Sequence, residues 1–251
     1  MMILSVKPRP RAIPALLALV LGTATPALAE KDLIELHMTA QKSLSGSAPS
    51  VFLTFDACMG KTDDRIVDTL INNRIAATFF VTARWINKNP VALARLKAHP
   101  DLFEIENHGA NHIPAVDRPG SIFGIAAAGS PASVELEVSG GEQAILAAGF
   151  QRPRWFRGAT AEYTASSMAE IKAMGYQIAG FSLNGDMGAT LKASTVERRI
   201  SAAKDGDVII AHVNQPDRSS GEGVAKALLA LKARGVVFLK LDRFSVAGHV
   251  N

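Results

Sequence analysis

Val51-Phe-Leu-Thr-Phe-Asp56 is the stretch that decides the fold class. The run is short, rich in aromatic and branched residues, and ends at an acidic residue. It therefore predicts a strand buried on both faces rather than a helix. Residues 63–73 follow with a helical pattern that carries acidic residues in its first turn. A buried strand followed directly by a helix is the repeating unit of a parallel α/β sheet.

The same alternation continues to the end of the chain. Short apolar runs predict further strands at 76–82, 102–106, 154–156, 176–181, 208–211 and 236–239. Further helices are predicted at 90–98, 132–148, 165–174, 195–203 and 223–234. Gly140-Gly141 interrupts one of these helical patterns, and residues 109–130 predict a long loop. About seven strands separated by helices predict a single α/β domain with a barrel-like parallel sheet.

Five chemically capable side chains each follow a predicted strand: Asp56, His108, Arg157, Asp186 and His212. Any one of them taken alone is explained by turn and capping preferences. In parallel α/β folds, however, the carboxyl ends of the strands meet at one edge, where active sites form. Five such residues together predict one site at that edge.

The first 29 residues have the pattern of a secretory signal peptide. Three basic residues precede a short apolar core at 13–21, and Ala27-Leu28-Ala29 supplies small residues for cleavage. An uncleaved anchor is disfavoured, because about 10 apolar residues are too few to span about 30 Å of hydrocarbon. We expect a signal peptide (1–29), a lead-in segment (30–50) and a catalytic domain (51–251). The mature protein would be periplasmic or secreted, with no membrane contact after cleavage.

Removal of the signal peptide nearly neutralises the chain. The whole chain has 27 basic and 23 acidic side chains. Three of the basic ones lie in residues 1–29, so 24 basic and 23 acidic side chains remain. We see no basic cluster, which argues against a nucleic-acid partner. The single cysteine, Cys58, excludes a disulfide scaffold and a structural zinc site built from several cysteines.

The sharpest local pattern is Asn-His-Gly-Ala-Asn-His at 107–112, which places two histidines four residues apart. Two imidazoles at this spacing can share a metal ion if the backbone turns between them. On its own, the pattern is as often structural as functional. Its meaning therefore depends on the motifs around it.

Together with Thr54-Phe55-Asp56, Phe156-Arg157-Gly158 and a late strand ending at His212, the pattern resembles the polysaccharide deacetylases. These are carbohydrate esterases of family 4, which share the NodB-homology domain. The order and spacing agree over about residues 50–242. The resemblance implies a distorted (β/α)7-type barrel and metal-dependent hydrolysis of an N- or O-acetyl group on a sugar. It also implies an acetylated carbohydrate as substrate and one divalent ion, most simply zinc, as cofactor.

The resemblance implies a role for each matched residue. Asp56 corresponds to the catalytic base, and Arg157 to the residue that orients this base. His212 corresponds to the catalytic acid. His108 and His112 correspond to two metal ligands.

One residue of the family pattern is missing, because the third metal ligand, an Asp directly after the base, is Ala57 here. Catalytic zinc usually has three protein ligands, so two imidazoles alone hold it poorly. Asp56 itself, Cys58 or Asp186 could replace the missing ligand, and the alternative is a metal-free or very weak site. We favour Asp56, which is nearest in the matched motif. We also expect the substitution Ala57→Asp to tighten metal binding.

Two other classes of function stay open. Cys58 lies directly after a strand and could be the nucleophile of a cysteine hydrolase, although the histidine pair has no role in that scheme. Alternatively, the loss of a ligand at Ala57 could leave a catalytically weak carbohydrate-binding relative. The glycan itself is not indicated, since Trp85 and Trp155 are the only tryptophans. Phe123 and Tyr163 lie on predicted rim loops.

Overall fold

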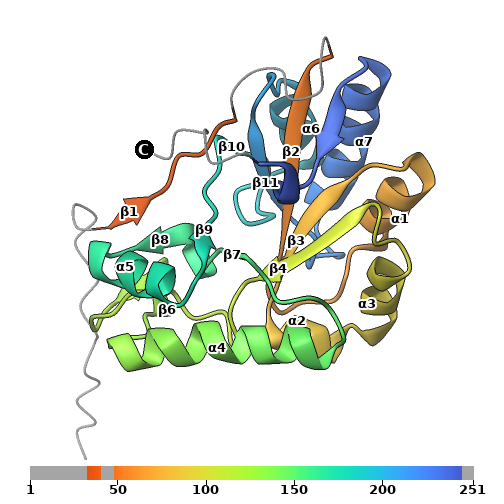
Figure 1. Cartoon of the computed structure of the whole chain (residues 1–251). Helices are drawn as coiled ribbons and strands as arrows, with labels where there is room; N and C mark the ends of the chain where they lie inside the picture. Colours follow the sequence, from red (N-terminus) through yellow and green to blue (C-terminus); the bar gives the residue numbers. More distant parts are fainter. Residues whose placement is uncertain (1–32, 41–47, 245–251) are drawn as a thin grey trace, which may run out of the picture.

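The computed structural model describes residues 33–40 and 48–244. The predicted signal peptide lies outside the described residues. The described chain forms a curled parallel sheet, a half-barrel, with helices packed around its outside (Figure 1). This confirms the predicted single α/β domain with parallel strands.

The central sheet has eight strands in the described part of the chain, and all of their pairings are parallel. These strands are β2 (Ser50–Ala57), β3 (Ala77–Val81), β4 (Phe103–Asn107), β7 (Trp155–Phe156), β9 (Gln177–Ile178), β10 (Leu183–Asn184), β11 (Val208–His212) and β12 (Val237–Leu239). The order across the sheet is β10-β11-β2-β3-β4-β7-β9, and β12 pairs with the beginning of β2. The register places Asp56 beside His212 of β11 and beside Phe80 of β3. The carboxyl ends of these strands therefore meet at one edge.

Seven α-helices accompany the sheet in the described ranges. They are α1 (Asp64–Asn73), α2 (Ala83–Lys88), α3 (Pro90–Lys97), α4 (Pro131–Ala147), α5 (Ala165–Ala173), α6 (Ala193–Ser201) and α7 (Ser220–Ala233). Two short antiparallel pairs complete the fold: β1 (Ile34–Glu35) with β8 (Glu162–Tyr163), and β5 (Ser121–Ile122) with β6 (Ile125–Ala126). The sequence had not predicted α2, β10 or these pairs, because each is too short to show a hydrophobic period.

Strand β2 directs its side chains alternately to the two faces of the sheet. Val51, Leu53, Phe55 and Ala57 all belong to the apolar cluster that includes residues of the helices. Successive side chains on a strand point to opposite faces, so the even-numbered residues, including Asp56, face the inside of the curled sheet. The apolar odd-numbered residues anchor the strand and leave Asp56 at the mouth.

Helix α4 corrects the prediction that Gly140-Gly141 would interrupt it, since it runs unbroken from Pro131 to Ala147. A Cβ on Gly141 would lie 2.1 Å from the Asn107 side chain and 2.8 Å from the backbone of Gly109. The glycines therefore allow the helix to approach the residues that follow β4, at the cost of weaker helix propensity. The loop predicted at 109–130 likewise contains the β5–β6 hairpin.

The described part of the predicted lead-in segment packs into the domain. Leu36 and Met38 are buried, and the Met38 backbone N–H donates to the Phe181 carbonyl at 3.2 Å. The strand predicted at 176–181 is reduced to Gln177–Ile178, and Phe181 instead pairs with this N-terminal segment. Among the described residues, no helix is long and apolar enough to cross a membrane.

Candidate active site

The carboxyl edge of the sheet brings together the five residues predicted from their positions after strands. Asp56 and His212 lie at the ends of β2 and β11, and His108 directly follows β4. Arg157 follows β7, and Asp186 follows β10. Four of them are buried, and His212 is partly exposed. Direct contacts connect Asp56 with Arg157 and His108, and His212 with Asp186.

Asp56 is held by Arg157. The guanidinium Nη1 donates to Asp56 Oδ1 at 2.9 Å and to Thr54 Oγ1 at 2.8 Å, and Nη2 donates to the Gly180 carbonyl at 2.9 Å. Burial alone would raise the pKa of Asp56, but His108, Arg157 and His212 hold it below its ordinary value. Asp56 is therefore an ionised, oriented carboxylate at neutral pH.

His212 forms a second pair with Asp186. Its Nδ1 lies 2.9 Å from Asp186 Oδ1, and its backbone N–H donates to Oδ2 at 2.7 Å. Burial would lower the pKa of His212, but Asp186 raises it well above its ordinary value, with a further contribution from Cys58. The Asp186 carboxylate accepts from Nδ1–H, which leaves Nε2 to interact with other groups, Cys58 among them.

Cys58, His108 and His112 form a third group. One ligand atom from each lies within 4.8 Å of the other two, with Cys58 Sγ 3.6 Å from His108 Nε2. His108 Nδ1 lies 2.5 Å from the Arg157 carbonyl, which can only accept a hydrogen bond. Nδ1 therefore carries the proton, and in the neutral ring the Nε2 lone pair faces Cys58.

The contacts of the three candidate third ligands give a different ranking from the one drawn from the sequence. Asp56 Oδ2 is 3.7 Å from His108 Nε2, but Asp56 is bound to Arg157 and does not belong to the group of three. Asp186 is bound to His212. Two imidazoles and a thiol are ligands that zinc uses in proteins. The geometry thus favours Cys58, the second of the three candidates.

Glu137 of α4 is a residue that the sequence reasoning missed. Its buried carboxylate accepts hydrogen bonds from the backbone N–H groups of Asn111, at 2.9 and 3.0 Å, and Ile113, at 3.1 Å. These two residues flank His112, which has a φ of 60°. Such a backbone is uncommon outside glycine, so Glu137 stabilises the turn that presents His112. Glu137 and Gly141 are four residues apart, so they lie on the same face of the helix, and this spacing could have indicated Glu137 from the sequence.

Three of the four aromatic residues named above are buried and therefore cannot contact a sugar at the surface. Trp85, Trp155 and Tyr163 are buried, and the Tyr163 hydroxyl accepts from the Gly158 backbone N–H at 2.7 Å. Phe123, by contrast, is 80% exposed at the β5–β6 turn.

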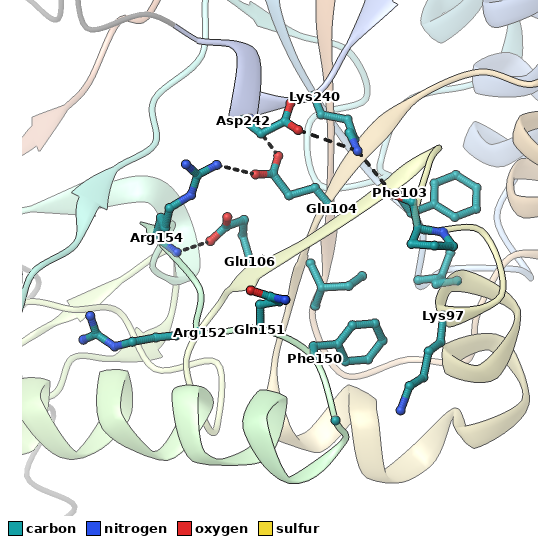
Figure 2. A pocket seen from close by; sticks show the side chains of 14 residues that line it. Lys97, Phe103, Glu104, Glu106, Phe150, Gln151, Arg152, Arg154, Lys240 and Asp242 are labelled. Carbon is teal, nitrogen blue, oxygen red and sulfur yellow. Dashed lines mark hydrogen bonds and ion pairs between the residues drawn. The ribbon is translucent and has the colours of Figure 1, made fainter.

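A cavity of about 550 Å³ lies elsewhere, on the side where β4 and β7 begin (Figure 2). Figure 2 shows Glu104 and Glu106 side by side on β4, facing Arg154. The Glu104 carboxylate pairs with the Arg154 guanidinium at 3.4 Å, and Glu106 accepts from the Arg154 backbone N–H at 2.7 Å. The cavity contains none of the residues that the sequence singled out for chemistry.

The fold defines the class first: a parallel α/β half-barrel with its polar residues gathered at the carboxyl ends of the strands. Within that class the chain belongs to the polysaccharide deacetylase family, whose sequence profile matches residues 44–179. This confirms the resemblance drawn from the motifs. No curated protein sequence matches the chain.

Solved structures of carbohydrate esterase family 4 share the fold. Peptidoglycan deacetylase PdaC from Bacillus subtilis is 19% identical with a TM-score of 0.65, covering 79% of this chain and 90% of its own. A family 4 carbohydrate esterase from Streptomyces lividans, in complex with acetate, is 19% identical with a TM-score of 0.62, covering 78% and 94%. A family 4 pseudoenzyme from Bacillus anthracis is also 19% identical with a TM-score of 0.61, covering 79% and 66%. Family membership alone therefore does not establish activity.

Proposed function

We propose that this protein hydrolyses an N- or O-acetyl group on a carbohydrate with the help of a divalent ion bound at His108 and His112. One observation carries the proposal. Asp56 has its pKa lowered and His212 has its pKa raised, at the same edge of the sheet and beside the histidine pair. Two groups with oppositely shifted pKa values suit a general base and a general acid at neutral pH.

Each side chain then has a distinct task. When bound, the ion would polarise the acetyl carbonyl and lower the pKa of a water molecule. Asp56, oriented by Arg157, accepts a proton from the attacking water as the water oxygen bonds to the acetyl carbon, and the bond from that carbon to the sugar nitrogen or oxygen then breaks to release acetate. His212 donates its Nε2 proton to the departing amine or alkoxide, while Asp186 holds Nδ1–H and stabilises the charged ring.

The setting proposed for this reaction is outside the cytoplasm. Residues 1–29 would be removed as a signal peptide, and residues 51–251 would form the catalytic domain, acting on an acetylated glycan in the periplasm or medium. N-terminal sequencing of the exported protein should then begin at Glu30. A chain that keeps Met1 and stays with the membrane would contradict this part of the proposal.

The first experiment is acetate release by the purified mature protein from a panel of acetylated glycans. We expect activity that a chelator removes and that added divalent ion restores. The Asp56→Asn variant serves as the matched inactive control, since its amide can still accept from Arg157. Activity that survives chelation and is lost on thiol alkylation would instead identify a cysteine hydrolase.

A second function, weak or inactive carbohydrate binding, is favoured by one specific observation. The family's third ligand is absent at position 57, and the similar structures include a pseudoenzyme. The weak or inactive binding function would be supported if the protein binds a glycan but releases no acetate with any of the divalent ions tested.

A further inference from the structure

The register of strand β2 shows that a carboxylate at position 57 would not face the histidine pair. β2 stays extended through Ala57, whose backbone pairs with Val81 of β3. Ala57 is fully buried in the apolar cluster that also contains Phe55. The alternation of a strand turns residue 57 away from the inner face and returns residue 58 to the side of Asp56. Position 58, not 57, therefore faces the histidine pair.

We infer that Cys58 supplies the third protein ligand as a thiolate, so that this site selects zinc-like ions over hard ions such as Mn²⁺ and Mg²⁺. The inference deepens the proposed function and rests on its assignment of His108 and His112 to a divalent ion. Thiolate favours borderline and soft ions, whereas carboxylate suits Mg²⁺ and Mn²⁺. A carboxylate replaced by a thiolate thus changes which ion the site holds.

The observed separation of the donors agrees with this assignment. A Zn–S bond of about 2.3 Å and a Zn–N bond of about 2.0–2.1 Å, at a tetrahedral angle, put sulfur and nitrogen about 3.6 Å apart. Cys58 Sγ and His108 Nε2 are 3.6 Å apart. The tautomer of His108, with its proton on Nδ1 toward the Arg157 carbonyl, leaves Nε2 as the ligand atom.

The same register argues against the expectation that Ala57→Asp would tighten metal binding. A carboxylate at position 57 would enter the apolar cluster behind β2, which is made up of hydrophobic side chains. Burying an unpaired charge is costly, so this substitution should destabilise the fold and leave metal affinity no better than that of the wild type.

The test is optical titration of the metal-stripped mature protein with Co²⁺. Cys58 is the only cysteine in the chain, so a sulfur-to-cobalt charge-transfer band in the near ultraviolet can come only from Cys58. We expect the wild type to show the band and to saturate at one equivalent. Cys58→Ser should lose the band and bind Zn²⁺ at least about 100-fold more weakly, since removal of outer-shell partners alone costs about 10–100-fold.

Cys58→Asp is the matched variant for selectivity. It should bind Co²⁺ without the band, and its preference for Zn²⁺ over Mn²⁺, measured by competition, should narrow by about tenfold or more. Circular dichroism establishes that each variant is folded. If Cys58→Ser does not fold, the wild-type spectrum alone decides the question.

Two results would overturn the inference: a wild type that binds one Co²⁺ without the band, or a Cys58→Ser variant that binds Zn²⁺ as tightly as the wild type. Neither measurement uses a glycan. A band without acetate release would therefore leave the ligand assignment standing and remove the deacetylase function. Metal-dependent acetate release without a band would do the reverse.

Discussion

Two buried carboxylates, on strands β2 and β4 of the same sheet, have pKa values that are shifted in opposite directions. Asp56 and Glu106 are both less than 5% exposed. The pKa of Asp56 is lowered by His108 and Arg157, against the effect of burial. Burial and the adjacent Glu104 instead raise the pKa of Glu106 to about 9, although two backbone N–H groups donate to it at 2.7 Å.

This difference shows that burial alone does not make a catalytic carboxylate. Opposite charges beside Asp56 keep it ionised and able to accept a proton at neutral pH. Burial, together with the like charge of Glu104, raises the pKa of Glu106 and keeps it protonated, so it acts as a structural acceptor. The cavity beside Glu106 has a volume of about 550 Å³ (Figure 2). The groups that suit acid–base chemistry lie instead at the carboxyl edge of the sheet.

The largest effect is expected from Asp56→Asn. Loss of the general base should lower the rate of acetate release by about 10²–10⁴-fold. Metal content should be unchanged, because Asp56 pairs with Arg157 and does not belong to the Cys58–His108–His112 group. Kinetics and elemental analysis on the same preparation check both parts. Loss of the ion in this variant would show that Asp56 is a ligand after all.

The second largest effect is expected from Asp186→Asn, which should change the pH dependence of kcat. Asp186 raises the pKa of His212, so its removal lowers that pKa. The protonated acid is then lost at lower pH, and the alkaline limb of kcat should move toward lower pH. The drop in rate at neutral pH should be smaller than for complete loss of the acid in His212→Ala. An unmoved alkaline limb would contradict the role of the pair.

Glu137→Gln should weaken metal binding by about 10–100-fold, the usual cost of losing a partner that orients a ligand. The amide keeps one acceptor oxygen, so the turn around His112 loosens without a steric clash. Glu135→Gln is the matched control, since Glu135 lies on the exposed face of the same helix. Isothermal titration with Zn²⁺ measures both. Equal affinity of the two variants would show that the turn does not depend on Glu137.

The smallest effect is expected from Glu106→Gln, which should change the stability of the fold but not the activity. Between its ordinary pKa of 4.5 and about 9, Glu106 binds a proton in the folded but not the unfolded protein. Stability is therefore lost as pH rises through that window. Glutamine mimics the protonated acid, so above neutral pH it should raise Tm by about 2–4 °C, the shift for 1 kcal/mol in a chain of this size. Acetate release should stay unchanged. A variant with a steeper fall of Tm with pH than the wild type would refute this account.

The amino-acid sequence alone determined the alternation of the longer strands and helices and most of the residues at the strand ends. Apolar runs such as Val51–Phe55 specify buried strands locally, and parallel strands necessarily bring their carboxyl ends together. Asp56, His108, Arg157 and His212 could therefore be assigned to one site, and the family resemblance followed from their spacing. These are properties of local pattern and topology.

Only the tertiary structure decided which residue faces the histidine pair and what supports the turn that presents them. Whether β2 ends at Asp56 or continues through Ala57 depends on its pairing with β3, and one residue of extension exchanges the faces of positions 57 and 58. The approach of α4, which brings Glu137 to Asn111 and Ile113, depends on contacts between segments far apart in the chain. Both outcomes are set by packing between elements, which a single local pattern does not contain.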